Sequence, residues 1–246
     1  MIHHVAVTGS TNDDMMALVR DGAPEGTWLR ADRQQGGRGR QGRAWVSPPG
    51  NLYASTLVRR LGGDPPAPSL AMVAAVALDE LLQAWVGAGR LSIKWPNDLL
   101  VDGAKISGIL LEGAEAAVVV GIGVNLAHHP ETVDRPATSL AALGLSVPDP
   151  ADFVEELARV FAAWLARWRG AGQGGGTWGG AWGGGLAAVL ARWQARAHPP
   201  GTALSVRMPD ATLEGLYDGL SPDGALRLRG ADGRVHLVHA GDVFLL

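Results

Sequence analysis

The chain has 246 residues, contains no cysteine and carries a formal net charge of −3 at pH 7. The lack of thiols excludes disulfides, a thiolate nucleophile and a cysteine-based zinc site, and the charge confines any nucleic-acid role to a local basic patch. Because hydrophobic residues make up 47% of the chain, we expect a packed core rather than disorder.

Neither a signal peptide nor a membrane span is expected. The first residues, Met1-Ile2-His3-His4, lack the basic start of a secretory signal. The longest apolar stretch, Leu70 to Trp85, contains Asp79 and Glu80 and is short for a bilayer. The sequence therefore predicts a soluble, cytoplasmic protein with no membrane partner.

The first half of the chain alternates short apolar runs with polar turns. Val5 to Val7 predicts a short strand, and Ser10 or Thr11 can cap a helix that runs through Val19. A long helix, apolar nearly all round, is expected over Ser69–Trp85. Further strands are expected over Gly26–Asp32, Leu52–Val58, Ser92–Trp95, Ile106–Leu111 and Ala116–Val120, with Gly113 at the turn between the last two.

The second half predicts two helices and then a small β domain. Apolar residues recur at steps of three or four over Pro148–Arg169, whereas Gly170–Gly185 is typical of a flexible loop. A short helix over Leu186–Ala197 ends at a His-Pro-Pro-Gly turn, which we take as the boundary between domains 1–197 and 198–246. Short strands separated by turns, which suggest a small β-barrel, are expected over Thr202–Met208, Thr212–Tyr217, Ala225–Arg229 and Val235–Val238.

Residues 36–45, GGRGRQGRAW, concentrate glycine and arginine in an otherwise non-basic chain. Glycines let the backbone move and approach a ligand closely, and guanidinium groups can bind phosphate oxygens with two hydrogen bonds. A loop that closes over a phosphorylated ligand, an RGG-like nucleic-acid segment and a plain solvated loop all fit this composition. The stretch is single, internal and flanked by predicted strands, which favours the closing loop.

The stretch KWPND, residues 94–98, ends a predicted strand in a lysine and a proline turn. Lys94 can neutralise a carboxylate or phosphate, and Asp98 can bind Mg²⁺ or accept a proton. A turn in which Asn97 or Asp98 bonds its own backbone explains the same residues without any ligand.

Three further groups could take part in chemistry. Ser10-Thr11-Asn12 offers three small polar side chains at a helix start, where capping explains only one. Lys105 begins an apolar strand, which is ordinarily a solvated position. Gly121 and Gly123, before Asn125, lack the GxGxxG pattern but could let a ligand pack against the backbone.

Taken in order, these motifs closely resemble those of the bacterial biotin protein ligases. The resemblance covers about Val5 to Leu126 and rests on STN (10–12), GRGRQGR (37–43), NLY (51–53), KWPND (94–98), KISGIL (105–110) and GIGVN (121–125). It implies an α+β fold: a mixed β-sheet with packed helices, a class II synthetase-like catalytic domain, followed by a small SH3-like β-barrel. It also implies an ATP-dependent ligase that activates biotin as biotinyl-5′-AMP, with Mg²⁺, and transfers it to a lysine of a biotin carboxyl carrier protein.

By this resemblance, catalytic roles are expected for Arg40, Lys94, Asp98 and Lys105. Asp98 would orient or deprotonate the carrier lysine, and Mg²⁺ would bind near Asn97 or Asp98. Biotin and ATP would be bound by Ser10, Thr11, Asn12, Gln34, Gly37, Arg38, Gly39, Arg40, Trp45, Asn97, Lys105, Gly121, Gly123 and Asn125.

Some members of that family carry an N-terminal winged helix-turn-helix and act as repressors. Here the first motif begins at Ser10, so we expect no such domain and no sequence-specific DNA binding. A homodimer is compatible with the resemblance. Three alternatives remain: a lipoate ligase or octanoyl transferase of related fold, a nucleic-acid-binding module that uses the Gly/Arg loop, and a sensor that binds biotin or its adenylate without catalysis.

Overall fold

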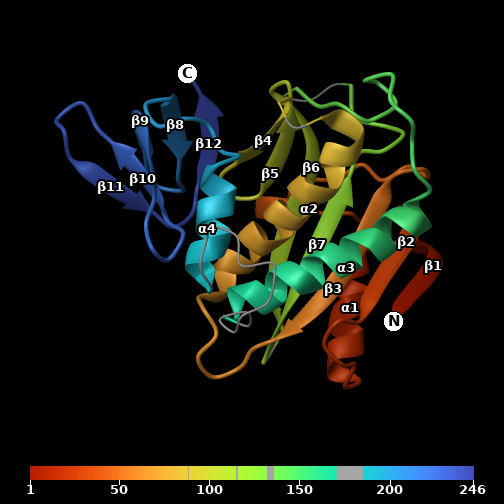
Figure 1. The fold of residues 1–246 in the computed structure, drawn as a ribbon. Coiled ribbons are helices and arrows are strands. Elements are labelled where there is room, and N and C mark those ends of the chain that lie inside the picture. Colours follow the sequence, from red (N-terminus) through yellow and green to blue (C-terminus); the bar gives the residue numbers. More distant parts are fainter. Residues whose placement is uncertain (88, 115, 132–135, 171–184) are drawn as a thin grey trace.

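The computed structural model describes residues 1–87, 89–114, 116–131, 136–170 and 185–246. It has a seven-stranded mixed sheet with packed helices and a separate five-stranded antiparallel sheet (Figure 1), which confirms the predicted α+β class. The first sheet comprises β1 (Ile2–Thr8), β2 (Trp28–Gln34), β3 (Leu52–Arg59), β4 (Leu91–Lys94), β5 (Asp98–Val101), β6 (Ala104–Ala114) and β7 (Ala117–Val124). The helices are α1 (Thr11–Arg20), α2 (Leu70–Val86), α3 (Pro150–Trp168) and α4 (Leu186–Gln194). The loop predicted over Gly170–Gly185 falls largely on residues 171–184, outside the described part.

The first sheet has the order β1-β2-β3-β7-β6-β5-β4. Its first two strands are parallel and the other neighbours are antiparallel. Two expectations about this sheet were wrong. Gly113 is not at a turn but pairs with Val118 inside the long β6–β7 hairpin, and Asp98 does not stay in a turn but begins β5, opposite Lys94.

The two faces of the first sheet carry different helices. Since side chains alternate along a strand, Leu52, Ala54 and Val58 of β3 join the large core with α2 and α3. Leu57 of β3 points to the other face and packs with Met15 of α1 in a smaller cluster. Helix α1 therefore covers the face opposite α2 and α3.

Helix α2 forms the centre of the core. The segment Ala67–Val86 is long and apolar enough to cross a membrane by length and composition, with mean hydropathy 1.5, but 78% of that window is buried inside the protein. Its one fully buried charge, Asp79, forms ion pairs with Arg192 of α4 at 2.6 Å and with Arg196, just after that helix, at 2.9 Å. A buried carboxylate requires such partners, so these pairs fix α4 against α2.

The second sheet has the order β11-β10-β9-β8-β12. Its strands are β8 (Ala203–Arg207), β9 (Thr212–Leu220), β10 (Leu226–Arg229), β11 (Val235–Val238) and β12 (Asp242–Leu245). The sequence did not predict β12. Within residues 185–246, all of which are described, backbone pairing leaves β11 and β12 as open edges, so the sheet is not closed into a barrel.

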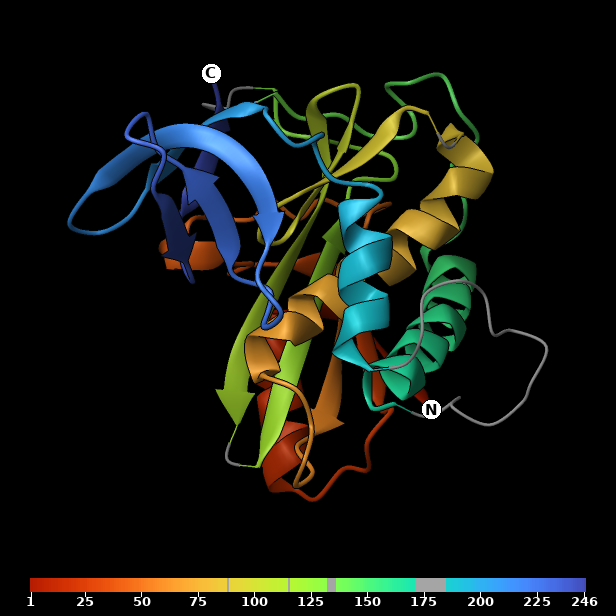
Figure 2. The same cartoon turned by 60° about the vertical axis from the view of Figure 1, so that its left-hand side comes forward.

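Helix α4 lies between α2 and the second sheet (Figure 2). It ends at Gln194, and β8 begins at Ala203. The boundary between residues 197 and 198 stays a proposal.

Candidate functional site

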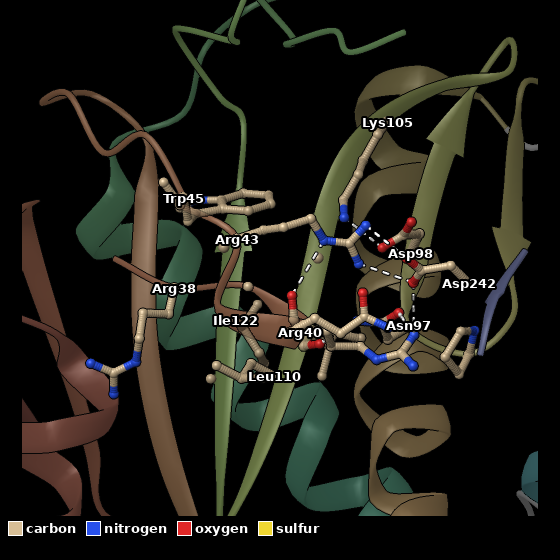
Figure 3. Close-up of a pocket in the computed structure, with 18 of the residues that line it drawn as sticks. Arg38, Arg40, Arg43, Trp45, Asn97, Asp98, Lys105, Leu110, Ile122 and Asp242 are labelled. Carbon is tan, nitrogen blue, oxygen red and sulfur yellow. Dashed lines mark hydrogen bonds and ion pairs between the residues drawn. The ribbon is translucent and has the colours of Figure 1, made fainter. Parts of the chain in front are cut away.

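A cavity of about 870 Å³ lies between the first sheet, the Gly/Arg loop and the second sheet (Figure 3). Among the residues predicted to bind or act, Gly37 is the one that does not line it. The others, brought together from six separate stretches of the chain, are Ser10, Thr11, Asn12, Gln34, Arg38, Gly39, Arg40, Trp45, Lys94, Asn97, Asp98, Lys105, Gly121, Gly123 and Asn125. Their individual roles stay predictions.

One part of the cavity is a connected polar network at the start of α1. Gln34 Oε1 accepts from the backbone N and from Oγ1 of Thr11, at 2.9 and 3.1 Å. Ser55 Oγ lies 2.8 Å from Thr11 Oγ1 and donates to Asn12 Oδ1 at 2.6 Å. Asn12 Nδ2 donates to Glu112 Oε2 at 2.6 Å. These side chains are therefore held in place before any ligand binds.

Ser10 occupies the N-cap position of α1 but makes no side-chain capping bond. The sequence thus placed the helix start correctly at Ser10, but the expected side-chain cap is absent, and Thr11 is already inside the helix and bonds Gln34. Both side chains are buried at the cavity wall, where small polar groups can orient a ligand with donors and acceptors of its own.

Three glycines form the floor of the cavity. A Cβ on Gly121 would lie 2.3 Å from Asn12 Oδ1, and a Cβ on Gly123 would lie 2.6 Å from the Trp45 ring. Gly108 pairs with Gly123 across β6 and β7, and a Cβ on Gly108 would lie 3.0 Å from the same ring. The glycines thus make room for Asn12 and Trp45 on the sheet, and these two side chains form the surface that a ligand would meet.

Gly37 and Asn125 support the cavity from behind. A Cβ on Gly37 would lie 2.7 Å from the Trp45 carbonyl oxygen and 2.8 Å from Ser47 Oγ, so no side chain fits there. Asn125 lines the cavity, but its Nδ2 donates to the carbonyl oxygen of Thr138 at 3.0 Å. Both residues fix the backbone around the site.

Asp98 lies between two ammonium groups. Lys105 Nζ donates to Oδ1 at 2.6 Å, and Lys94 Nζ lies 3.2 Å from Oδ2. Burial alone would raise the pKa of Asp98, but the charges of Lys105 and Lys94 outweigh it and hold the pKa below its ordinary value. Asp98 is therefore ionised and a weak base, suited to positioning the two lysines. Lys105 also lies 5.4 Å from the centre of the Trp45 ring.

The arginines of the Gly/Arg loop contact carboxylates and carbonyl oxygens of the protein. Arg38 forms a two-bond ion pair with Asp13 of α1, and Figure 3 shows it turned away from Arg40 and Arg43. Arg43 forms a similar pair with Asp242 of β12, at 2.9 and 3.0 Å. Arg40 donates to the carbonyl oxygen of Gly241 at 3.1 Å and to Asn97 Oδ1 at 3.4 Å.

The second sheet contributes a wall that the sequence did not predict. Arg207, Asp242, Val243 and Phe244 all line the cavity. The Arg207 guanidinium lies 5.0 Å from the Phe244 ring centre, a cation–π contact that holds it at the cavity edge. At four residues, β12 is too short for its side-chain alternation to mark it as a strand in the sequence.

The described residues do not provide a complete set of Mg²⁺ ligands at this site. Among the described residues there is no group of three or more His, Asp or Glu side chains that could hold a metal ion. Both oxygens of Asp98 face ammonium groups, and Asn97 Oδ1 faces Arg40. Mg²⁺ commonly binds through substrate phosphates and water with few protein ligands, and only that mode fits these residues.

Comparisons with known proteins agree with the geometry. Residues 5–126 match the Biotin/lipoate A/B protein ligase family, and residues 204–246 match the Biotin protein ligase C terminal domain. In fold, the chain is similar to the biotin protein ligase from Aquifex aeolicus in complex with biotin and ATP, with a TM-score of 0.83 at 24% identity, covering 100% of this chain and 98% of that one.

Two relatives are similar in sequence along nearly the whole chain. The biotin–[acetyl-CoA-carboxylase] ligase of Mycobacterium tuberculosis is 34% identical over 97% of this chain and 86% of its own length. That of Paracoccus denitrificans is 38% identical over 98% of both chains. This chain therefore belongs to the biotin protein ligase family.

Proposed function

We propose that the protein is an ATP-dependent biotin protein ligase. The observation that carries this proposal is the cavity itself, which joins the polar network of Thr11, Asn12 and Gln34 to the cations Lys94 and Lys105. Biotin has a ureido ring that needs hydrogen-bond donors and acceptors in a largely apolar pocket, and a carboxylate that must meet the phosphates of ATP. The names of the full-length relatives support the same substrate.

In the first step, a carboxylate oxygen of biotin attacks the α-phosphorus of ATP. The bond from the α-phosphorus to the oxygen that bridges it to the β-phosphorus breaks, and pyrophosphate leaves. Both reactants are anionic, so the step needs fixed positive charge where they meet. Lys94, Lys105 and Arg40 supply it, and Asp98 lies between the two lysines. Arg38 would add its charge only on leaving Asp13.

In the second step, the amine of a carrier lysine attacks the carbonyl carbon of biotinyl-5′-AMP. An amide bond forms, AMP leaves, and the amine gives up a proton. The mixed anhydride reacts with water, so the cavity must stay closed until the carrier arrives. We assign that closure to the Gly/Arg loop, whose Arg43 contacts the second sheet. The carrier is a biotin carboxyl carrier protein, as the names of the relatives imply.

Several finer points belong to the same proposal. Mg²⁺ would enter with the phosphates of ATP and screen their charge, near Asn97 and Asp98. The protein would act in the cytoplasm, and no helix but the buried α2 segment is long and apolar enough to span a membrane among the described residues. The expectations of no sequence-specific DNA binding and of a homodimer stay predictions.

The test is biotin-dependent exchange of labelled pyrophosphate into ATP by the purified protein. Exchange with biotin, and none with lipoate or octanoate, is expected. Exchange driven by lipoate or octanoate instead would assign the protein to the related acyl ligases. A folded protein that exchanges with no acid, and binds an oligonucleotide without ATP in a salt-dependent way, would act through nucleic-acid binding. Binding of biotin without exchange would indicate a sensor.

A further inference from the structure

Glu112 of β6 joins the polar network at the start of α1 to the Gly/Arg loop. One carboxylate oxygen, Oε2, accepts from Asn12 Nδ2 at 2.6 Å, and the other, Oε1, lies 3.7 Å from Arg38 Nη2. Side chains alternate along a strand, so Glu112 is on the same face of β6 as Gly108 and Leu110, which line the ligand cavity. Glu112 itself is not among the described residues that line it. Any effect of Glu112 on a ligand must therefore pass through the residues that it contacts.

The Glu112 carboxylate fixes which way the Asn12 amide faces. A carboxylate accepts hydrogen bonds and donates none, so Asn12 must turn its NH2 group toward Glu112. The amide oxygen of Asn12, Oδ1, then faces Ser55 Oγ at 2.6 Å. Because an amide oxygen cannot donate, the single proton of the Ser55 hydroxyl is used on Asn12.

The same reasoning extends to Thr11. Its Oγ1 lies 2.8 Å from Ser55 Oγ and 3.1 Å from Gln34 Oε1, which also accepts from the Thr11 backbone N at 2.9 Å. Neither neighbour can donate to Thr11, because Ser55 has given its proton to Asn12 and Gln34 presents an amide oxygen. The Thr11 proton is therefore used inside the network. Toward the cavity, which Thr11 lines, its hydroxyl oxygen can only accept.

We propose that Glu112 is a positioning residue that sets the direction of these hydrogen bonds and so makes Thr11 an acceptor for the ligand. The chain of bonds must end on a group that only accepts, and the Glu112 carboxylate is that end. A ureido ring carries N–H groups that need acceptors, so this arrangement favours a ring that donates over one that has no N–H. The inference rests on the proposed function and adds a source of its substrate preference.

The variant Glu112→Gln tests the direction of the network with almost no change in side-chain size. Arg38 can only donate, so the new amide oxygen should face Arg38 and the new NH2 group should face Asn12. Asn12 then turns over, and the Ser55 proton becomes available to Thr11, which can keep its own proton for the cavity. We expect biotin to bind about fivefold more weakly, the factor of one ordinary hydrogen bond, in calorimetry without ATP. The melting temperature should stay near wild type.

A double-mutant cycle asks whether Glu112 acts through the network. Ser55 is fully buried and is not among the described residues that line the cavity. The variant Ser55→Ala removes the hydroxyl that connects Asn12 to Thr11. In the Ser55→Ala background, Glu112→Gln should therefore change the affinity for biotin less than it does in wild type. An equal change in both backgrounds would overturn the proposal.

The matched control is Asp13→Asn. It removes the other carboxylate that pairs with Arg38 and leaves the bond between Glu112 and Asn12 in place, so it should bind biotin as wild type does. Equal weakening in Asp13→Asn and Glu112→Gln, or no weakening in Glu112→Gln, would overturn the role of Glu112. A folded wild-type protein that does not bind biotin at all would overturn the proposed function, and this inference with it.

Discussion

Arg43 and Asp242 form a two-bond ion pair across the mouth of the ligand cavity, with N–O distances of 2.9 and 3.0 Å. Arg43 belongs to the Gly/Arg loop, and Asp242 is the first residue of β12 in the second sheet. The carboxylate is only 10% exposed, whereas the guanidinium is 48% exposed. The pair therefore anchors a solvent-facing loop to a fixed point on the neighbouring sheet.

The first prediction concerns this anchor. Asp242→Asn removes the charge that holds Arg43 and lies 3.8 Å from Arg40. Loss of about 1 kcal/mol of ion-pair stabilisation of the closed loop should raise the rate at which biotinyl-AMP escapes by roughly fivefold. The measurement is free biotinyl-AMP in solution after one turnover without carrier. The control Asp218→Asn breaks the pairs with Arg227 and Arg229 in the same sheet and should leave escape unchanged.

A second prediction concerns the closing loop itself. Arg40→Gly removes the bonds to Gly241 and Asn97 and one of the positive charges that line the cavity. We expect more reactive biotinyl-AMP to be released than from wild type, detected as biotin on lysines of a bystander protein. Arg60→Gly, an exposed arginine outside the cavity, is the control. Release no greater than wild type would show that the loop does not retain the intermediate.

A third prediction separates two roles for Asp98. Because its pKa is held below the ordinary value, Asp98 should position Lys94 and Lys105 rather than take a proton. Asp98→Asn should slow adenylate formation by tenfold or more, roughly what one charged contact contributes. Single-turnover transfer from preformed biotinyl-AMP should stay near the wild-type rate.

The matched control for Asp98 is Asp102→Asn, at the far end of the same hairpin, whose carboxylate pairs with the exposed Arg90. It should leave both steps unchanged. Transfer that collapses in Asp98→Asn while adenylate formation persists would instead establish Asp98 as the base for the carrier lysine.

The sequence predicted which residues line this site better than it predicted the contacts that those residues make. Motifs such as GRGRQGR and KWPND are short and local, so the resemblance was enough to predict that their residues line one site. The partners of the same residues come from far along the chain: Asp242 lies 199 residues from Arg43, and Ser55 lies 43 from Asn12. Such pairs depend on how the two sheets pack, which no local pattern encodes. The sequence likewise named Gly121 and Gly123 as binding positions but did not predict that Asn12 and Trp45 pack against them.

A fourth prediction tests those glycines. The substitution Gly121→Ala would place a Cβ 2.3 Å from Asn12 Oδ1, and Gly123→Ala would place one 2.6 Å from the Trp45 ring. Each should displace its neighbour and cost about 1–3 kcal/mol of stability. Gly121→Ala should also weaken biotin binding, measured by calorimetry without ATP. Gly113→Ala, on the same hairpin with nothing within 4 Å, is the control and should match wild type in both measurements.

The last prediction follows from His198. Burial, and then the charge of Lys94, hold its pKa below the ordinary value, while the unfolded chain has a pKa of about 6.5. Below pH 6.5 the unfolded state therefore binds more protons than the folded state, and stability falls as the pH drops. Above that pH the group contributes no pH dependence. Lys94 and Tyr217 are the other titratable groups on the small cavity that His198 also lines, and burial raises the pKa of Tyr217 to about 12, far above this range. We expect the melting temperature of wild type to fall more between pH 7 and 5 than that of His198→Asn.

The control is His3→Asn, on the edge strand β1, which should keep the wild-type dependence of melting temperature on pH. Equal slopes for wild type and His198→Asn would show that His198 takes up its proton as easily in the folded protein as in the unfolded chain.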